Sequence, residues 1–416
     1  MPVVGYPRPV VRGGTYALTK RTAFRKAFLA PWDPLVMQTW LYVLAGAQHR
    51  TGVSIHHTML NVSHQHTSVS TSEKANLPRF TEYAHREMSK AVNVLLAARR
   101  YEAPRQVFED RQTHQMRLLD APACMSHILY ERLNGVAAGL VAKPEHMPGC
   151  RFDFALWRGE PLVIKRPPLY FNPKTTETER ELYFDIDPLT YLEFGGDIDA
   201  IVHHFRRTER LGVQAFRRAR RFPVLGAKKL RRIHPYNEPR TNRETGRRLV
   251  PTFKLGARGV SGRVARIHAC QEVTAFRAEH ADAQTQRRRG REALYPAGTY
   301  KMRVEHDVDV AAPGASALVT APGLTLGEAK QRVDRFPAGV PNAPDQVASA
   351  FADEAASVLQ QDRMSFRGGD EPVGRSPNEP TVDVQHRLES RRESHASRVV
   401  VLRDHRRGRP SREPPE

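Results

Sequence analysis

Cysteine is scarce in this chain of 416 residues. There are three cysteines, Cys124, Cys150 and Cys270, and none of them forms part of a CxxC motif. An odd number without paired spacing argues against a disulfide framework and against a cysteine-ligated zinc site. The same usage is typical of a reducing compartment, so we expect a cytoplasmic protein.

Long apolar runs are also missing. No stretch approaches the ~18 consecutive apolar residues that a membrane span requires. The first residues, MPVVGYPRPVVRGG, lack the apolar segment of a secretory signal. We therefore expect neither a membrane partner nor export.

Acidic residues are few relative to basic ones. The chain has 45 Asp and Glu against 65 Lys and Arg, which gives a formal net charge of +20. Such a surplus favours a polyanionic partner, chiefly nucleic acid, although a merely basic surface is the alternative. The surplus is densest over residues 206–248, where 15 Lys and Arg face only Glu209, Glu238 and Glu244.

Hydrophobic periodicity predicts the secondary structure of the first part of the chain. Alternation and apolar spacing indicate strands over 15–19, 53–60 and 62–70 and helices over 33–49, 77–99 and 121–140. Residues 106–119 are ambiguous. This order predicts an α+β fold in which helices cover one face of a small antiparallel sheet.

The chain is expected to have three parts. Residues 1–180 form the predicted α+β domain, and residues 181–311 form a basic, mainly helical extension. Residues 312–416 are rich in Ala, Pro, Gly and mixed charge and have few large apolar residues, so we expect a mostly disordered tail.

His64-Gln65-His66 is a candidate metal-binding motif. Residues i and i+2 of a strand point to the same face, so the two imidazoles can converge on one cation. Mg²⁺, Mn²⁺ or Zn²⁺ would each accept such a pair. The chain has 18 histidines, so two unrelated histidines on one strand are a real alternative.

Tyr130 and Asn134 are the second candidate pair. They are spaced i, i+4 on a predicted helix and therefore share a face. A tyrosine hydroxyl can attack a phosphodiester when a metal polarises the phosphate, and an asparagine carbonyl can complete the metal shell. The alternative is a core tyrosine beside an asparagine that caps the helix before Gly135.

Together these motifs resemble the HUH-superfamily single-tyrosine transposases, in particular the REP-associated and related insertion-sequence enzymes. The matching segments are the strand that carries His64-Gln65-His66, the helix LPRFTEYAHREMSKAVN and the segment ILYERLNGVAAGLV. Family members usually have an apolar residue in place of Gln65 and a proline in place of Gly135. PPLYFNP and YPAGTYKMRV are similar to extensions of long members.

The resemblance implies a fold, a mechanism and a set of site residues. The implied fold is a ferredoxin-like α+β domain. His64, His66 and Asn134 would be the ligands of Mg²⁺ or Mn²⁺, and Tyr130 would be the nucleophile. The implied reaction is cleavage and rejoining of single-stranded or hairpin DNA through a 5′-phosphotyrosine link, as in transposition and recombination.

The basic segments are candidate DNA-binding elements. Arginine-rich helix faces track phosphates and release counterions, whereas a solvated basic face without a ligand is the alternative. The residues expected to contact DNA are Arg206, Arg207, Arg217, Arg218, Arg220, Arg221, Lys228, Lys229, Arg231 and Arg232. A DNA partner would make the protein nucleoid-associated.

Three functions compete. The first is a transposase-like endonuclease and strand transferase that acts through Tyr130. The second is a non-catalytic, domesticated DNA- or repeat-binding protein of the same fold, which the departures at Gln65 and Gly135 make plausible. The third is a zinc hydrolase, for which the sequence offers no clear carboxylate base beside the histidines. Whether the chain acts as a monomer or a homodimer is left open.

Overall fold

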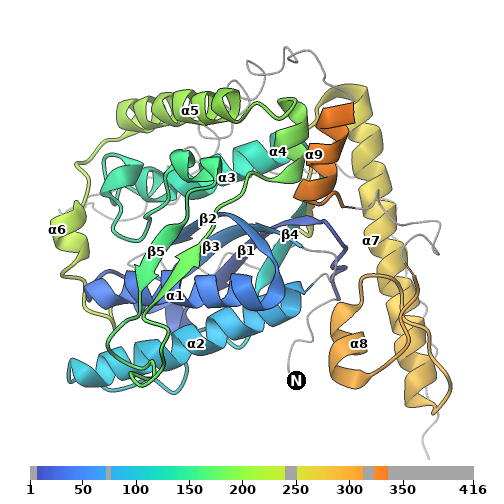
Figure 1. Cartoon of the computed structure of the whole chain (residues 1–416), viewed down its shortest axis with the longest axis horizontal. Coiled ribbons are helices and arrows are strands. Elements are labelled where there is room, and N and C mark those ends of the chain that lie inside the picture. Colours follow the sequence, from blue (N-terminus) through green and yellow to red (C-terminus); the bar gives the residue numbers. More distant parts are fainter. Residues whose placement is uncertain (1–6, 72–75, 239–250, 313–322, 336–416) are drawn as a thin grey trace, which may run out of the picture. The chain divides into compact units, whose positions relative to one another are not determined.

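The structure is a computed structural model that describes residues 7–71, 76–238, 251–312 and 323–335 (Figure 1). Its centre is a five-stranded sheet with the strand order β2-β3-β1-β4-β7. The strands are β1 (Thr15–Arg21), β2 (Ser54–Leu60), β3 (His64–Ser70), β4 (His114–Leu118) and β7 (Phe253–Lys254). β7 pairs with β4 in parallel, and the other neighbours are antiparallel.

The register of β3 decides which residues face which side of the sheet. β3 pairs with β1 from Thr15↔Ser70 to Arg21↔His64. Because strand side chains alternate, His64 and His66 lie on one face, and Gln65 lies on the other. An irregularity in β2 between Ile55 and His57 shifts its pairing with β3.

Two helices cover the Gln65 face. α1 (Pro34–Thr51) begins where the Asp33 side chain accepts a hydrogen bond from the Leu35 amide at 2.8 Å. α2 (Leu77–Ala98) packs against α1 and buries the residues that recur at three and four along it, Phe80, Ala84, Met88, Ala91, Val92, Leu95 and Leu96. The predicted helices over 33–49 and 77–99 are confirmed.

α3 (Ala121–Ala137) lies on the opposite face, so helices cover both sides of the sheet (Figure 1). Glu131 of α3 contacts His57 and Ser68, whereas His85 of α2 contacts Gln65. The α+β class is confirmed, but the prediction of helices on one face is wrong. α3 is buried on almost all sides because α5 (Ile198–Ala219) covers its outer surface.

Several expected boundaries differ from the structure. The ambiguous segment 106–119 contains β4, whose residues His114, Gln115 and Arg117 are too polar for a clear strand pattern. α3 ends at Ala137 and not at residue 140. Asn134 is therefore inside the helix and does not cap it before Gly135, since the left-handed glycine at the helix end is Gly139 with φ 68°.

The rest of the chain surrounds this centre. A second sheet pairs β5 (Leu162–Lys165) with β6 (Glu179–Leu182) and contacts α1. The further elements are η1 (Ala23–Arg25), η2 (Pro144–His146), η3 (Phe154–Arg158), α4 (Pro188–Glu193), α6 (Ala227–Leu230), α7 (Gly259–Arg288), α8 (Tyr300–His306) and α9 (Leu326–Arg335).

The three-part division stays a prediction, and the core bears on it. One cluster of buried apolar side chains includes residues of β1 and extends past residue 180 to Phe216 of α5 and Leu230 of α6. In the expected tail, residues 326–335 form α9, which packs against α4. Residues 313–322 and 336–416 of that tail lie outside the described residues.

Candidate active site

The fold brings the four predicted site residues together. His64 and His66 stand on the face of β3 that α3 covers, and their ring centroids lie 4.8 Å apart. Tyr130 of α3 lies edge-on to His66, with ring centroids 5.8 Å apart and an interplanar angle of 83°. Asn134 follows one turn later on the same helix face. Residues of β3 and α3, which are far apart in the sequence, therefore form one cluster.

Asn61 joins His64 to Asn134. Its side-chain nitrogen lies 2.9 Å from His64 Nε2 and donates a 2.8 Å hydrogen bond to Asn134 Oδ1. An amide nitrogen has only donors, so His64 Nε2 must be the acceptor. The lone pairs of His64 and Asn134 consequently point at one position, which the Asn61 amide fills.

His66 presents an unsatisfied nitrogen to the same cluster. The residue is 5% exposed, and its Nε2 is buried without a hydrogen-bond partner among the described residues. Its Nδ1 lies 3.0 Å from the Thr19 hydroxyl. When Nδ1 donates to Thr19, Nε2 carries a free lone pair, which is the tautomer that a metal ligand needs.

Both imidazoles are held in their neutral form. Burial, together with the smaller effect of the nearby charges of Arg21 and Arg25, lowers the pKa of His64 to about 4. Burial also lowers the pKa of His66 well below its ordinary value, with His64 the largest of the charged neighbours that add to the effect. Neutral imidazoles are the form that binds metals, so neither ligand must lose a proton near neutral pH.

These donors fit a divalent cation. His64 Nε2 and Asn134 Oδ1 converge on the Asn61 amide, and the neighbouring His66 imidazole has a buried Nε2 that lacks a partner. The amide oxygen suits Mg²⁺ or Mn²⁺, and the imidazoles suit softer ions as well. The described residues contain no cluster of three or more His, Cys, Asp or Glu that could hold a metal, so two histidines and an asparagine are the candidate set.

Tyr130 is not a core tyrosine. Its side chain is 37% exposed, although α3 is otherwise buried. This exposure removes the alternative in which Tyr130 serves only to fill the interior. Solvent can reach its ring, which packs edge-on against His66.

His127 and Glu131 are site residues that the sequence predictions missed. The His127 ring lies beside Tyr130, with centroids 5.7 Å apart, and its Nε2 is 3.3 Å from Glu131 Oε1. The Tyr130 ring is therefore a neighbour of both His66 and His127. The i, i+4 spacing of His127 and Glu131 was the signal that could have found them.

Glu131 anchors a buried polar network. Its Oε2 lies 2.9 Å from His57 Nδ1 and accepts a 2.9 Å hydrogen bond from the Ser68 hydroxyl. His57 Nε2 lies 3.9 Å from Cys150 Sγ, which also accepts from Arg132 at 3.3 Å. Burial raises the pKa of Glu131 and lowers that of His57, and their mutual hydrogen bond opposes both shifts.

The polar residue between the two histidines has partners on the other face. Gln65 is 1% exposed, and its Oε1 accepts a 2.8 Å hydrogen bond from Thr67. Its Nε2 lies 3.3 Å from His85 Nε2 of α2. A hydrogen-bonded layer thus replaces the apolar contact that the resemblance would imply, and Gln65 is compatible with an ordered site.

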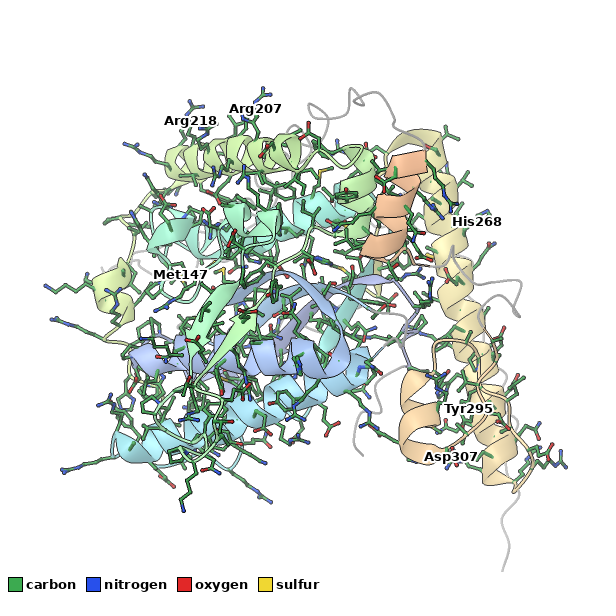
Figure 2. All side chains as sticks on the ribbon, in the orientation of Figure 1. Met147, Arg207, Arg218, His268, Tyr295 and Asp307 are labelled. Carbon is green, nitrogen blue, oxygen red and sulfur yellow. The ribbon has the colours of Figure 1, made fainter. Side chains whose placement is uncertain are left out.

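Gly135 packs closely against two methionine side chains, Met147 and Met59. A Cβ atom at this position would lie 3.0 Å from Met147 Sδ and 3.5 Å from Met59 Cε. Met147 is the side chain labelled beside α3 in Figure 2. The absence of a side chain at Gly135 therefore lets the segment around Met147 pack tightly on the helix that carries Tyr130.

The ten basic residues lie on α5, on α6 and in the segments that follow these helices. Nine are exposed, and Arg220 is half-buried because it donates to the Val136 carbonyl at the end of α3. Arg206 pairs with Asp153 at 2.9 Å. Figure 2 shows Arg207 and Arg218 pointing outward from α5, away from α3. The rest of the basic stretch, residues 239–248, lies outside the described residues.

The link between α5 and α6 runs along the end of α3. The amides of Leu225 and Gly226 donate to the carbonyls of Gly139 and Leu140 at 2.9 and 2.8 Å. Arg220 contacts the same end of α3. The basic segment is thus tied to the helix that carries Tyr130 and Asn134.

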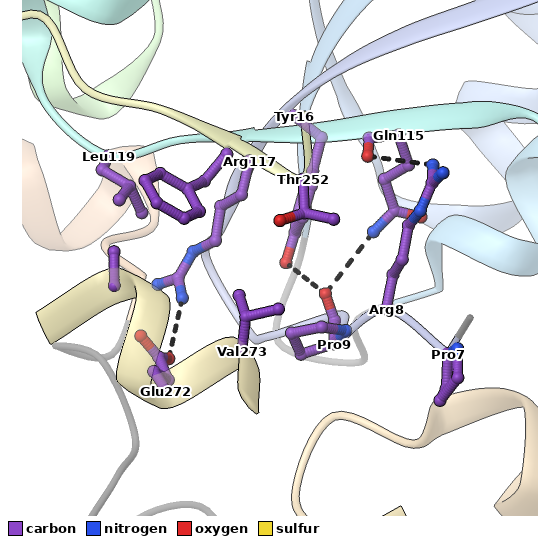
Figure 3. A pocket seen from close by; sticks show the side chains of 12 residues that line it. Pro7, Arg8, Pro9, Tyr16, Gln115, Arg117, Leu119, Thr252, Glu272 and Val273 are labelled. Carbon is purple, nitrogen blue, oxygen red and sulfur yellow. Dashed lines mark hydrogen bonds and ion pairs between the residues drawn. The ribbon is translucent and has the colours of Figure 1, made fainter. Parts of the chain in front are cut away.

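A separate cavity lies where the N-terminal segment, β4 and α7 meet (Figure 3). Its polar groups pair with one another: Arg8 donates to the Gln115 carbonyl, Tyr16 donates to the Pro9 carbonyl, and Arg117 lies 3.4 Å from Glu272. None of the predicted site residues lines it. The cavity is therefore distinct from the histidine cluster.

Comparisons with known proteins add little. No family model and no curated protein matches the chain. Among solved structures, it is similar to a REP-associated tyrosine transposase bound to a REP hairpin, with 15% identity and a TM-score of 0.30. That match covers 36% of this chain and 83% of the other. A likeness this small carries no argument about activity. Every helix in the described part of the chain is too short or too polar to cross a membrane.

Proposed function

We propose that this protein is a transposase-like enzyme that cleaves and rejoins single-stranded or hairpin DNA through a covalent link to Tyr130. The observation that carries the proposal is the convergence of His64 Nε2 and Asn134 Oδ1 on one position, beside the unpartnered Nε2 of His66 and the exposed Tyr130. The succession β1-α1-β2-β3-α2-β4, with its antiparallel pairing, supports the ferredoxin-like fold that the resemblance implies.

In the cleavage step, the Tyr130 oxygen attacks the phosphorus of a phosphodiester. A bond forms between the phenolic oxygen and phosphorus, and the bond from phosphorus to the 3′-oxygen breaks. The DNA end with the 5′-phosphate stays on Tyr130, and the 3′-oxygen leaves as a hydroxyl after taking up a proton. Attack by a 3′-hydroxyl on the phosphotyrosine reverses the step and rejoins the strand.

The cluster supplies the groups that this step needs. A Mg²⁺ or Mn²⁺ ion held by His64, His66 and Asn134 would polarise the phosphate and stabilise charge on the leaving oxygen. His127, whose ring lies beside that of Tyr130, would accept the phenolic proton. Glu131, whose Oε1 lies 3.3 Å from His127 Nε2, would stabilise the protonated imidazole.

The basic residues of α5 and α6 would hold the strand. Each phosphate contact by an arginine or lysine releases counterions and adds salt-dependent affinity. Arg220 and the link between these helices contact the C-terminal end of α3, so a strand held there would lie at the end of the helix that carries Tyr130. DNA is accordingly the proposed partner.

One observation favours a second function, that of a non-catalytic DNA-binding protein of the same fold. The Asn61 amide already satisfies His64 and Asn134, which gives the cluster a stable arrangement without a metal. A bound cation must displace this amide. The two functions therefore differ in whether the cluster binds a cation at all.

The test uses hairpin DNA with randomised single-stranded flanks, labelled at either the 3′ or the 5′ end, together with Mn²⁺. The enzyme should retain the 3′ label covalently and release the 5′ label as a fragment with a 3′-hydroxyl. Tyr130→Phe should bind the DNA but retain no label. Binding without an adduct in the wild-type protein would reject the enzyme and support the DNA-binding alternative.

A further inference from the structure

Phe24 is a large apolar residue that the fold presents to solvent. Its side chain is 76% exposed. Its backbone is left-handed, with φ 51° and ψ 22°, and the next residue, Arg25, has φ 54°. Two consecutive left-handed residues other than glycine are unfavourable, because each side chain crowds the following carbonyl group.

The segment around Phe24 is held in place on both sides. The Thr22 amide donates to the Ser63 carbonyl at 2.8 Å, and the Ala23 amide donates to the Val107 carbonyl at 2.9 Å. The Ala27 amide donates to the Asn237 carbonyl at 3.0 Å. The surrounding structure thus enforces the strained turn and directs the ring outward. Strain maintained in this way is a recurrent feature of binding sites.

The backbone before Phe24 runs beside the start of β3, the strand that carries His64 and His66. Arg21, three residues before Phe24, is the ladder partner of His64, and Ser63 precedes that histidine. Arg25 directly follows Phe24 in the same left-handed turn. Neither guanidinium forms an ion pair within the described residues, so both charges are available to an anion. An exposed aromatic ring that is flanked in the sequence by two such arginines combines the features that recognise an unpaired nucleotide.

We propose that Phe24 is a stacking platform for one unpaired nucleobase next to the phosphate at Tyr130, with Arg21 and Arg25 on the flanking phosphates. This inference rests on the proposed function, since it requires a single strand at the cluster. A base stacks on an aromatic ring whatever its sequence, so the platform fixes the position of the strand without reading it. The two arginines identify the occupant as a polyanion.

Binding of an oligothymidylate of about 20 nucleotides, without metal, tests the platform separately from cleavage. Fluorescence anisotropy should show that Phe24→Ala weakens binding about five- to a hundredfold, whereas Phe24→Trp retains the wild-type affinity. Leu294→Ala, which removes another exposed apolar side chain, is the matched control and should bind normally. Photo-crosslinking to 5-iodouracil in the same strand should label residues 22–26.

A second variant separates the platform from any effect on folding. Phe24→Gly relieves the left-handed strain, so it should raise the melting temperature while weakening binding as much as Phe24→Ala. Wild-type affinity in Phe24→Ala would overturn the platform and leave the proposed function intact. Failure of the wild-type protein to bind the oligothymidylate would also overturn the platform, whereas the adduct assay with hairpin DNA decides the proposed function separately. A change of oligomeric state in Phe24→Ala with unchanged DNA affinity would instead assign the ring to a contact between copies of the chain.

Discussion

The side-chain nitrogen of Asn61 lies 2.8 Å from the side-chain oxygen Oδ1 of Asn134 and donates a hydrogen bond to it. The same nitrogen meets His64 Nε2 at 2.9 Å. Asn61 therefore occupies the position on which the lone pairs of two proposed metal ligands converge. A donor at that position in the metal-free protein and a cation in the metal-bound protein would satisfy the same two groups.

Replacing Asn61 by aspartate should make folding depend on metal. Without a cation, a carboxylate faces two acceptors and loses both hydrogen bonds, so the free energy of unfolding should fall by about 1–3 kcal/mol. With Mn²⁺, the carboxylate adds a ligand, and the increase in melting temperature on metal addition should exceed that of the wild type. Thermal melts with and without Mn²⁺ measure both effects. An identical metal-dependent shift in the two proteins would contradict a cation site here.

His127 should control the rate of adduct formation. If it accepts the Tyr130 proton, His127→Gln should slow the formation of the covalent adduct by about 10²- to 10⁴-fold. Because the variant has no imidazole at this position, the rate of adduct formation should no longer depend on the ionisation of His127. Single-turnover measurements across pH provide both values. A His127→Gln protein with the wild-type rate and pH dependence would exclude this role.

Glu131 should act through His127 and through the network around it. Glu131→Gln keeps the shape of the side chain but places an amide donor among the donors that surround it. The expected loss of stability is about 1–3 kcal/mol, because buried hydrogen bonds are broken. The adduct rate should fall together with a shifted pH dependence. Chemical denaturation separates the effect on folding from the effect on rate.

His85 should make stability depend on pH. Burial lowers its pKa from 6.5 to about 3, so the unfolded chain binds a proton between these values and the folded chain does not. Its contribution to stability is complete above pH 6.5 and is lost as the pH falls towards 3, at about 1.4 kcal/mol per pH unit. His85→Gln should reduce the slope of unfolding free energy against pH by that amount. An unchanged slope in urea melts between pH 4 and 6, roughly the centre of this window, would contradict the assignment.

The basic face of α5 should determine the salt dependence of DNA binding. Arg217, Arg218 and Arg221 are exposed, whereas Arg220 supports the end of α3 and is best left intact. Replacing the three by alanine should reduce the slope of log affinity against log salt by about 0.7 for each lost phosphate contact.

A control with the same change of charge is available on α7. Arg263, Arg266 and Arg287 are exposed on that helix, and their replacement by alanine removes the same three charges. The α7 variant should retain the wild-type slope. Equal losses of slope in the α5 and α7 variants would show that net charge, and not the α5 surface, determines binding.

The sequence predicted those features of the site that depend on local periodicity. Strand alternation placed His64 and His66 on one face of their strand, and helical spacing placed Tyr130 and Asn134 on one face of their helix. Asn61, whose side chain joins His64 to Asn134, comes from the turn between β2 and β3, where no periodicity applies. His85, which satisfies Gln65, lies on a helix whose packing face was predicted but whose contact with this strand position was not.

The burial of α3 explains why the sequence did not predict helices on both faces of the sheet. Its buried residues include the four consecutive residues Cys124, Met125, Ser126 and His127, which surround the helix axis, because the sheet packs on one side and α5 on the other. A helix without one apolar stripe gives no indication of which face of a sheet it covers. The left-handed turn at Phe24 and Arg25 could not be predicted either, because neither residue is a glycine.

Identification of the residue that carries the DNA tests the central claim most directly. The wild-type protein is incubated with Mn²⁺ and the 3′-labelled hairpin, and the covalent product is digested and analysed by mass spectrometry. The account predicts a 5′-phosphonucleotide on the peptide that contains Tyr130, and no such product from Tyr130→Phe. A nucleotide on any other residue, or cleavage of the hairpin that survives in Tyr130→Phe, would contradict it.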